Sequence, residues 1–272
     1  MPSTPSAARG TPSRRTPELL APAGTRAMQD TAFAFGADAV YAGQPRYSLR
    51  ARNNDYGSLE VLSQARADAR AQGKQFYLVS NIFPHNAKVK TYLADMADAI
   101  AMQPDALIMA DPGLIAMVRE TWPEVPVHLS VQANTVNYAA VRFWKSIGIS
   151  RVILSRELSL DEVAEIRQEC PDMELEVFVH GALCIAYSGR CLLSGYFNRR
   201  DPNQGTCTNS CRWDYKVHPE NESADGRPES KVWLLEEKER PGELMPIEED
   251  EHGTYIMNSR DLRAIEHVQR LV

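Results

Sequence analysis

Three features that would assign this protein to a class at once are absent from its sequence. No run of residues approaches 18 uninterrupted apolar positions, so no membrane-spanning helix is predicted. Residues 1–16 contain no apolar stretch like that of a secretory signal, and we expect a disordered segment on a cytoplasmic protein. Positive charge is not in excess, because the net charge is −6. A nucleic-acid partner would therefore need a local basic cluster.

Motifs typical of hydrolases are also missing. The sequence has neither a His-Glu-x-x-His zinc helix nor a Gly-x-Ser-x-Gly nucleophile elbow. A pair such as Ser188 with His180 lacks an orienting carboxylate at a recognisable spacing. These absences argue against a peptidase.

Cysteine is scarce but concentrated, since four of the five cysteines lie between positions 184 and 211. This pattern favours a reduced compartment with a metal site over a disulfide framework. The spacing Cys184-x6-Cys191-x15-Cys207-x3-Cys211 supplies four thiolates, which suit either zinc or an iron–sulfur cluster. Zinc sites commonly show two tight pairs, and here only the second pair is close, so an iron–sulfur cluster is favoured. The cluster could still have a structural role. Cys170, the fifth cysteine, is expected to be a buried hydrophobic residue.

Short apolar runs alternate with segments of helical periodicity from position 18 onward. The predicted strands are Glu18–Pro22, Ala39–Ala42, Gln75–Ser80, Ala106–Ala110, Val127–Val131, Arg151–Ser155 and Leu175–Val179. The predicted helices include Leu59–Gln72, Val89–Met102, Leu114–Thr121, Val136–Ile147 and Leu160–Glu169. Strands that alternate with helices pair in parallel, and seven such units favour an α/β fold of the (βα)8 barrel type.

The alternation of apolar runs and helical segments ends after Cys211. We expect the barrel and its cysteine-rich loop to occupy residues 17–212, and a charged hairpin or flexible insertion to occupy 213–253. Residues 254–272 should return to the barrel, with a short strand at Tyr255–Met257 and a helix start at Ser259–Leu262. The chain stops before an eighth strand, so a truncated barrel is expected.

Polar residues follow directly after several predicted strands, where barrel active sites are built. The candidates for a common catalytic pocket are Asn81, Asp111, Gln132, Arg156, Glu157 and His180. His180 could act as a general acid or base, and Glu176, on the same face of the strand, could be its partner. The alternative for each is an ordinary turn residue, helix cap or wall residue.

The segment from Glu176 to Cys191 reads EVFVHGALCIAYSGRC and resembles the signature of the collagenase-like peptidases, a family of unassigned catalytic type. The resemblance extends over 17–271 and includes Glu18–Gly24, Gly36–Gly43, Ser155–Glu157 and Asn258–Leu262.

Within that family the run from Cys207 to Trp213 is most similar to a branch that forms 5-hydroxyuridine at the tRNA wobble position, with prephenate as a required metabolite. A sister branch hydroxylates ubiquinone precursors with a 4Fe-4S cluster, but the position of its fourth cysteine is Arg263 here. The resemblance thus implies a 4Fe-4S-dependent tRNA hydroxylase, with a peptidase or a quinone-precursor hydroxylase as alternatives. An electron-transfer partner is required but not identified.

Basic and aromatic residues are interleaved around the cysteines. The candidate RNA-binding residues are Arg190, Arg199, Arg200, Arg212, Tyr187 and Trp213. Arginine pairs with phosphate and aromatic rings stack on unpaired bases, although the rings could instead pack the loop against the barrel. Arg46, Arg50 and Arg52 could extend this rim or bind a small anionic metabolite such as prephenate.

Overall fold

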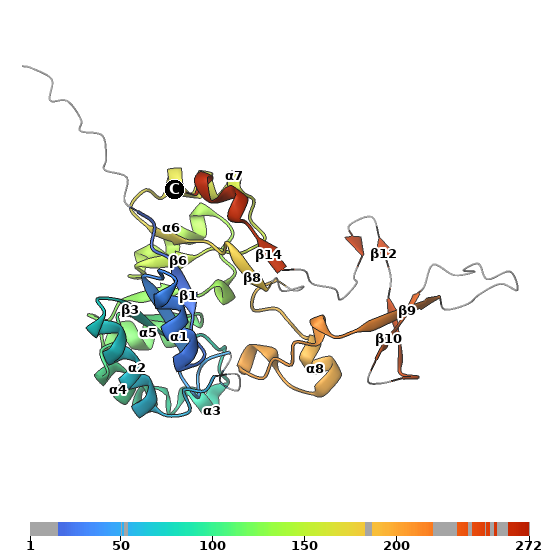
Figure 1. The fold of residues 1–272 in the computed structure, drawn as a ribbon, viewed down its shortest axis with the longest axis horizontal. Helices are drawn as coiled ribbons and strands as arrows, with labels where there is room; N and C mark the ends of the chain where they lie inside the picture. Colours follow the sequence, from blue (N-terminus) through green and yellow to red (C-terminus); the bar gives the residue numbers. More distant parts are fainter. Residues whose placement is uncertain are drawn as a thin grey trace, which may run out of the picture.

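A curled sheet of seven parallel strands forms the centre of the computed structural model (Figure 1). The structure describes residues 16–49, 51, 54–182, 187–219, 233–238, 241–247, 249–250, 253–254 and 261–271. The strands follow one another in sequence order, as in a βα barrel. They are β1 (Leu20–Pro22), β2 (Ala39–Gly43), β3 (Gln75–Ser80), β4 (Ala106–Met109), β5 (Val127–Leu129), β6 (Arg151–Ile153) and β7 (Glu174–Glu176). All seven predicted strands are confirmed.

Helices connect consecutive strands. They are α1 (Arg26–Ala34), α2 (Leu59–Ala71), α3 (Asn86–Val89), α4 (Tyr92–Ala101), α5 (Pro112–Thr121), α6 (Tyr138–Ser146) and α7 (Leu160–Glu169). Five of them begin at a side chain that accepts a hydrogen bond from the first turn, namely Thr25, Ser58, Asp111, Asn137 and Ser159. The helix predicted over Val89–Met102 is confirmed as α4, which begins three residues later, and the short α3 before the break at Lys90 and Thr91 was not predicted.

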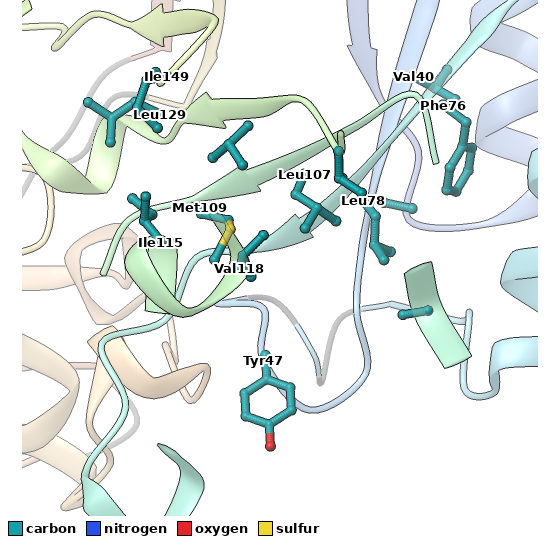
Figure 2. Packing of buried hydrophobic residues seen from close by; sticks show 14 of the residues in the cluster. Val40, Tyr47, Phe76, Leu78, Leu107, Met109, Ile115, Val118, Leu129 and Ile149 are labelled. Carbon is teal, nitrogen blue, oxygen red and sulfur yellow. The ribbon is translucent and has the colours of Figure 1, made fainter. Parts of the chain in front are cut away.

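Two apolar clusters fill the two faces of the sheet. The larger one lies between the sheet and the helices and includes Leu78, Leu107, Met109, Ile115 and Val118 (Figure 2). The smaller cluster points into the barrel. It contains Ala39, Tyr77, Val79, Ala106, Ile108, Val131 and Ile153. The interior of the barrel is therefore packed at this cluster and is not an open channel there.

A partly buried ion cluster lies beside this smaller apolar cluster. Arg151 places its guanidinium 2.7 Å from a carboxylate oxygen of Glu18, 2.9 Å from Glu174 and 3.6 Å from Glu176. The bond to Glu18 joins residues 133 positions apart. Burial raises the pKa of Glu176 to about 7, although Arg151 acts in the opposite direction. Burial also lowers the pKa of the neighbouring His128 to about 3, so this ring stays neutral.

Beyond β7 the chain leaves the parallel sheet. The strand β8 (His180–Ala182) pairs antiparallel with β14 (Asp261–Arg263), and the 3₁₀ helix η5 (Ile265–Arg270) follows. The helix start expected at Ser259–Leu262 is therefore wrong, and Tyr255–Met257 lies outside the described residues.

A small antiparallel sheet follows the cysteine-rich segment. Its strands β9 (Tyr215–Pro219), β10 (Trp233–Glu237) and β11 (Leu244–Ile247) project away from the barrel (Figure 1). A two-residue pair, β12 (Glu249–Asp250) and β13 (Gly253–Thr254), comes next. Within the described residues, no helix is long and apolar enough to cross a membrane.

Candidate active site at the barrel mouth

The segment 187–212, which we call the cysteine loop, contains the short helix α8 (Leu193–Asn198) and packs on the loops that follow β2, β3 and β5. Gly189 has φ +74°, and a Cβ there would lie 2.4 Å from the carbonyl oxygen of Gln132. Gly205 has φ +91°, and a Cβ there would lie 2.7 Å from the carbonyl oxygen of Ser48. Both sites require glycine, since a larger residue would be strained and would push the loop away from the barrel. The cysteine loop is thus fitted closely to the C-terminal ends of the strands.

Hydrogen bonds hold the same arrangement. The amide of Phe83, which follows β3, donates to the carbonyl oxygen of Asn203 at 3.2 Å. The amide of Ser188 donates to the Glu157 carboxylate, after β6, at 3.4 Å. Together with the two glycine contacts, these bonds attach the cysteine loop to four different strand ends.

Three of the four predicted cysteine ligands lie on this loop. Cys191 and Cys211 are half-buried and Cys207 is exposed, while Cys184 lies outside the described residues. The Cys207 sulfur accepts hydrogen bonds from the amide of Asn209 at 3.5 Å and the hydroxyl of Ser194 at 4.0 Å. Among the residues that the structure describes, no three Cys, His, Asp or Glu side chains are grouped so that they could hold a metal ion.

Two of the predicted strand-end residues meet at the barrel mouth beneath the cysteine loop. Asn81 donates to the Ser130 hydroxyl at 3.2 Å and accepts from the amide of Leu49 at 3.1 Å. The same Ser130 hydroxyl accepts from the amide of Gln132 at 3.3 Å. The side-chain oxygen of Gln132 is buried and has no hydrogen-bond partner among the described residues. A buried acceptor of this kind is available to a ligand that carries a donor.

The other strand-end residues have more ordinary surroundings. The Asp111 carboxylate caps α5 by accepting from the amide of Leu114 at 2.8 Å. The Arg156 guanidinium lies over the ring of Phe178, 4.6 Å from its centroid. His180 is exposed on β8, apart from the buried mouth, and Glu176 faces Arg151 inside the barrel.

The predicted RNA-binding residues lie on the same loop. Tyr187 is 62% exposed, and Arg190, Arg199, Arg200 and Arg212 are exposed, whereas Trp213 is half-buried. No described residue forms a hydrogen bond or ion pair with the guanidinium of Arg199 or Arg200. The loop therefore offers unpaired positive charge on a protein whose net charge is negative.

Sequence reasoning missed Asp201 and Asn203. The Asp201 carboxylate accepts from the amide of Asn203 at 2.8 Å and so caps the 3₁₀ helix η3 (Pro202–Gln204). The Asn203 side chain donates to the carbonyl oxygen of Cys191 at 3.0 Å. The Asp-Pro pair is a recognisable cap signal, but nothing local indicates the bond to the cysteine.

Comparison with known proteins finds a matching family and relatives that share one name. The profile of peptidase family U32 matches residues 24–272. The chain is 60% identical over 276 residues to tRNA hydroxylation protein P of Escherichia coli K12, covering 94% of this chain and 61% of that protein. It is 56% identical over 279 residues to tRNA hydroxylation protein P of Haemophilus influenzae, with 94% and 60% covered. The chain thus spans about three fifths of the length of these curated relatives.

A solved structure, that of the U32 peptidase Mk0906, shares the fold. It superposes with a TM-score of 0.56 at 17% identity, covering 73% of this chain and 85% of that one. This likeness confirms the incomplete βα barrel and does not extend to chemistry.

Proposed function

This chain belongs to peptidase family U32, and from that membership we propose that it hydroxylates uridine at the tRNA wobble position. The product would be 5-hydroxyuridine, and the reaction would depend on a 4Fe-4S cluster held by Cys184, Cys191, Cys207 and Cys211. The names of two similar proteins, both called tRNA hydroxylation protein P, support RNA as the substrate class.

The observation that carries this proposal is the position of the cysteine loop. Active sites of βα barrels are built at the C-terminal ends of the strands. The loop with Cys191, Cys207 and Cys211 is attached to four of those ends, above the buried amide of Gln132. These cysteine side chains are thereby held where a substrate would enter.

The donor set suits a cluster better than a single zinc ion. Four thiolates about 2.3 Å from one tetrahedral ion must converge closely, whereas a cluster attaches each thiolate to a different iron atom. The preference for a cluster rests on the spacing of the cysteines in the sequence, in which only Cys207 and Cys211 form a close pair. The bonds from Asn209 and Ser194 to the Cys207 sulfur match the hydrogen bonding that tunes thiolate ligands. When bound, such a cluster supplies electron transfer, which amino-acid side chains cannot provide.

The protein's own groups would bind and orient the RNA. Arg199 and Arg200 would neutralise phosphates, and exposed Tyr187 would stack on an unpaired base. Prephenate, as the required anionic metabolite, needs a separate basic site. Arg46 is already paired with Asp95 at 2.5 Å, and Arg50 and Arg52 lie outside the described residues.

The test is an anaerobic metal analysis combined with a modification assay. We expect about four iron and four sulfide per chain, on the 4Fe-4S assignment. Cys191→Ser should lower the iron content and abolish 5-hydroxyuridine, measured by mass spectrometry of tRNA from cells that lack their own copy of the gene. Stoichiometric zinc without sulfide would refute the redox centre. Cleavage of gelatin by metal-free protein would instead favour a peptidase.

A further inference from the structure

A pocket of about 330 Å³ opens beside the cysteine site. Its walls come from the two ends of α8 and from η3. They include Leu192, Gly195, Arg199, Arg200, Asp201 and Asn203. Because Asn203 also bonds to the backbone of Cys191, the pocket and the cysteine site share a wall. A ligand in this pocket would lie next to whatever reacts at the cysteines.

The walls of the pocket are held in place before any ligand arrives. The amides of Arg199 and Arg200 donate to the carbonyl oxygens of Gly195 at 2.9 Å and Ser194 at 3.2 Å. The Thr206 hydroxyl donates to the carbonyl oxygen of Asp201 at 2.7 Å. A preorganised wall loses little conformational entropy on binding, which favours a binding role.

The backbone of Arg199 is unusual. It lies in the left-handed region with φ 54° and ψ 33°, which side chains other than glycine seldom adopt. This conformation ends α8, where the amides of Arg199 and Arg200 donate back to the helix. Glycine is the residue usually found at such a helix end, so an arginine here is a candidate for a role of its side chain.

We propose that this pocket binds one ribonucleotide next to the target nucleotide, with Arg199 and Arg200 on its phosphate and Asp201 accepting a hydrogen bond from its 2′-hydroxyl. Neither guanidinium has a partner among the described residues, so both are available to a phosphate. The Asp201 carboxylate would repel a phosphate, but it suits a donor. The 2′-hydroxyl is the donor that distinguishes RNA from DNA.

The openness of the pocket favours a polymer over a small metabolite. Leu192 is 77% exposed, and Arg199 and Arg200 are exposed as well. Sites for small molecules usually enclose most of the ligand surface. An exposed apolar side chain between basic residues instead suits a nucleotide whose neighbours continue along the surface.

This inference rests on the proposed RNA substrate, and the experiment separates the two. A labelled RNA hairpin with the anticodon loop and a DNA hairpin of the same sequence are titrated with the full chain, and binding is followed by fluorescence anisotropy. The parent should prefer RNA by about tenfold, the effect of one hydrogen bond to a charged group. Asp201→Asn keeps an oxygen that can cap η3, and it should lose most of this preference.

The arginine variants test the phosphate contact. Arg199→Gly relieves the left-handed strain, so thermal unfolding should occur no earlier than in the parent while RNA and DNA binding both weaken. Arg200→Ala should also weaken both, and each change should reduce the salt dependence, d log K/d log[salt], by about 0.7. Arg142 is an exposed arginine on α6, and Arg142→Ala serves as the matched control. It should change neither the affinity for the hairpins nor its salt dependence.

Four results would overturn the pocket assignment. Unchanged RNA affinity in a protein with both Arg199→Gly and Arg200→Ala would remove the phosphate site while leaving tRNA hydroxylation intact. Equal affinity of the parent for RNA and DNA would remove the role of Asp201. Calorimetric binding of prephenate that disappears in the arginine variants, with RNA binding unchanged, would assign the pocket to the metabolite. A parent that binds neither hairpin would refute the proposed function as well.

Discussion

Replacing Glu176 by glutamine should stabilise the protein above neutral pH. The carboxyl of Glu176 lies inside the barrel with only 20% of its side chain exposed, and burial raises its pKa to about 7. In the unfolded chain the same group has its ordinary pKa of 4.5. Between pH 4.5 and about 7, the folded state therefore retains a proton that the unfolded state has released. The free energy of unfolding falls as the pH rises through this interval.

The size of the effect follows from the same values. The rise in the pKa of Glu176 from 4.5 to about 7 corresponds to about 3 kcal/mol, at roughly 1.36 kcal/mol per pKa unit. Glu176→Gln should thus unfold with about the same free energy as the parent at pH 5 and with up to about 3 kcal/mol more at pH 8. The amide retains an oxygen that can accept from Arg151.

Urea denaturation of both proteins at a series of pH values from 5 to 8 measures this difference. Glu174→Gln is the matched control, because its carboxylate also pairs with Arg151 but is 61% exposed. It should change stability by less than about 1 kcal/mol at every pH. The reasoning is refuted if Glu176→Gln is less stable than the parent at pH 8, or if the difference between them does not grow with pH.

Three other substitutions test local features of the fold. Gly189→Ala should lower the free energy of unfolding by more than about 1 kcal/mol and expose Cys191 to thiol reagents, whereas Gly57→Ala, with open space around it, should do neither. Asp111→Ala should cost about 1 kcal/mol by thermal denaturation, as expected for a helix cap, and Asp111→Asn should restore most of it; loss of hydroxylation in a stable Asp111→Asn protein would show a chemical role instead. Arg66→Ala should destabilise by about 3 kcal/mol in urea, because Arg66 is nearly fully buried beside a carboxylate; a loss below about 1 kcal/mol would contradict this.

The strands of this barrel could be predicted because buried parallel strands are nearly continuous apolar runs. The segments 75–80 and 106–109 illustrate this, since almost every residue in them is buried. The break between α3 and α4 could not be predicted. There the buried Tyr47 hydroxyl lies 3.1 Å from Thr91 and 3.4 Å from the carbonyl oxygen of Lys88. These contacts depend on a residue more than 40 positions away, and the local periodicity of the sequence carries no information about it.

The candidate site was predictable to a similar extent. The polar residues after the strands identify the mouth of the barrel, and the cysteine spacing identifies the loop above it. Their mutual fit depends on Gly189 and Gly205, whose sequence signal is only that they are glycines. The role of Asp111 as a cap is indicated by the Asp111-Pro112 pair, whereas the partner of Glu176 appears only in three dimensions, because Arg151 lies on a neighbouring strand.

The ion pair between Glu18 and Arg151 has a consequence for synthesis on the ribosome. The two residues are 133 positions apart, so Glu18 waits about 7–27 s for its partner at the usual elongation rate of roughly 5–20 residues per second. During that time its carboxylate remains hydrated, and the interior of the barrel cannot close around it. The strand β1 can pair with β2 early, but the ion pair of Glu18, just before β1, can form only after Arg151 on β6 has been synthesised.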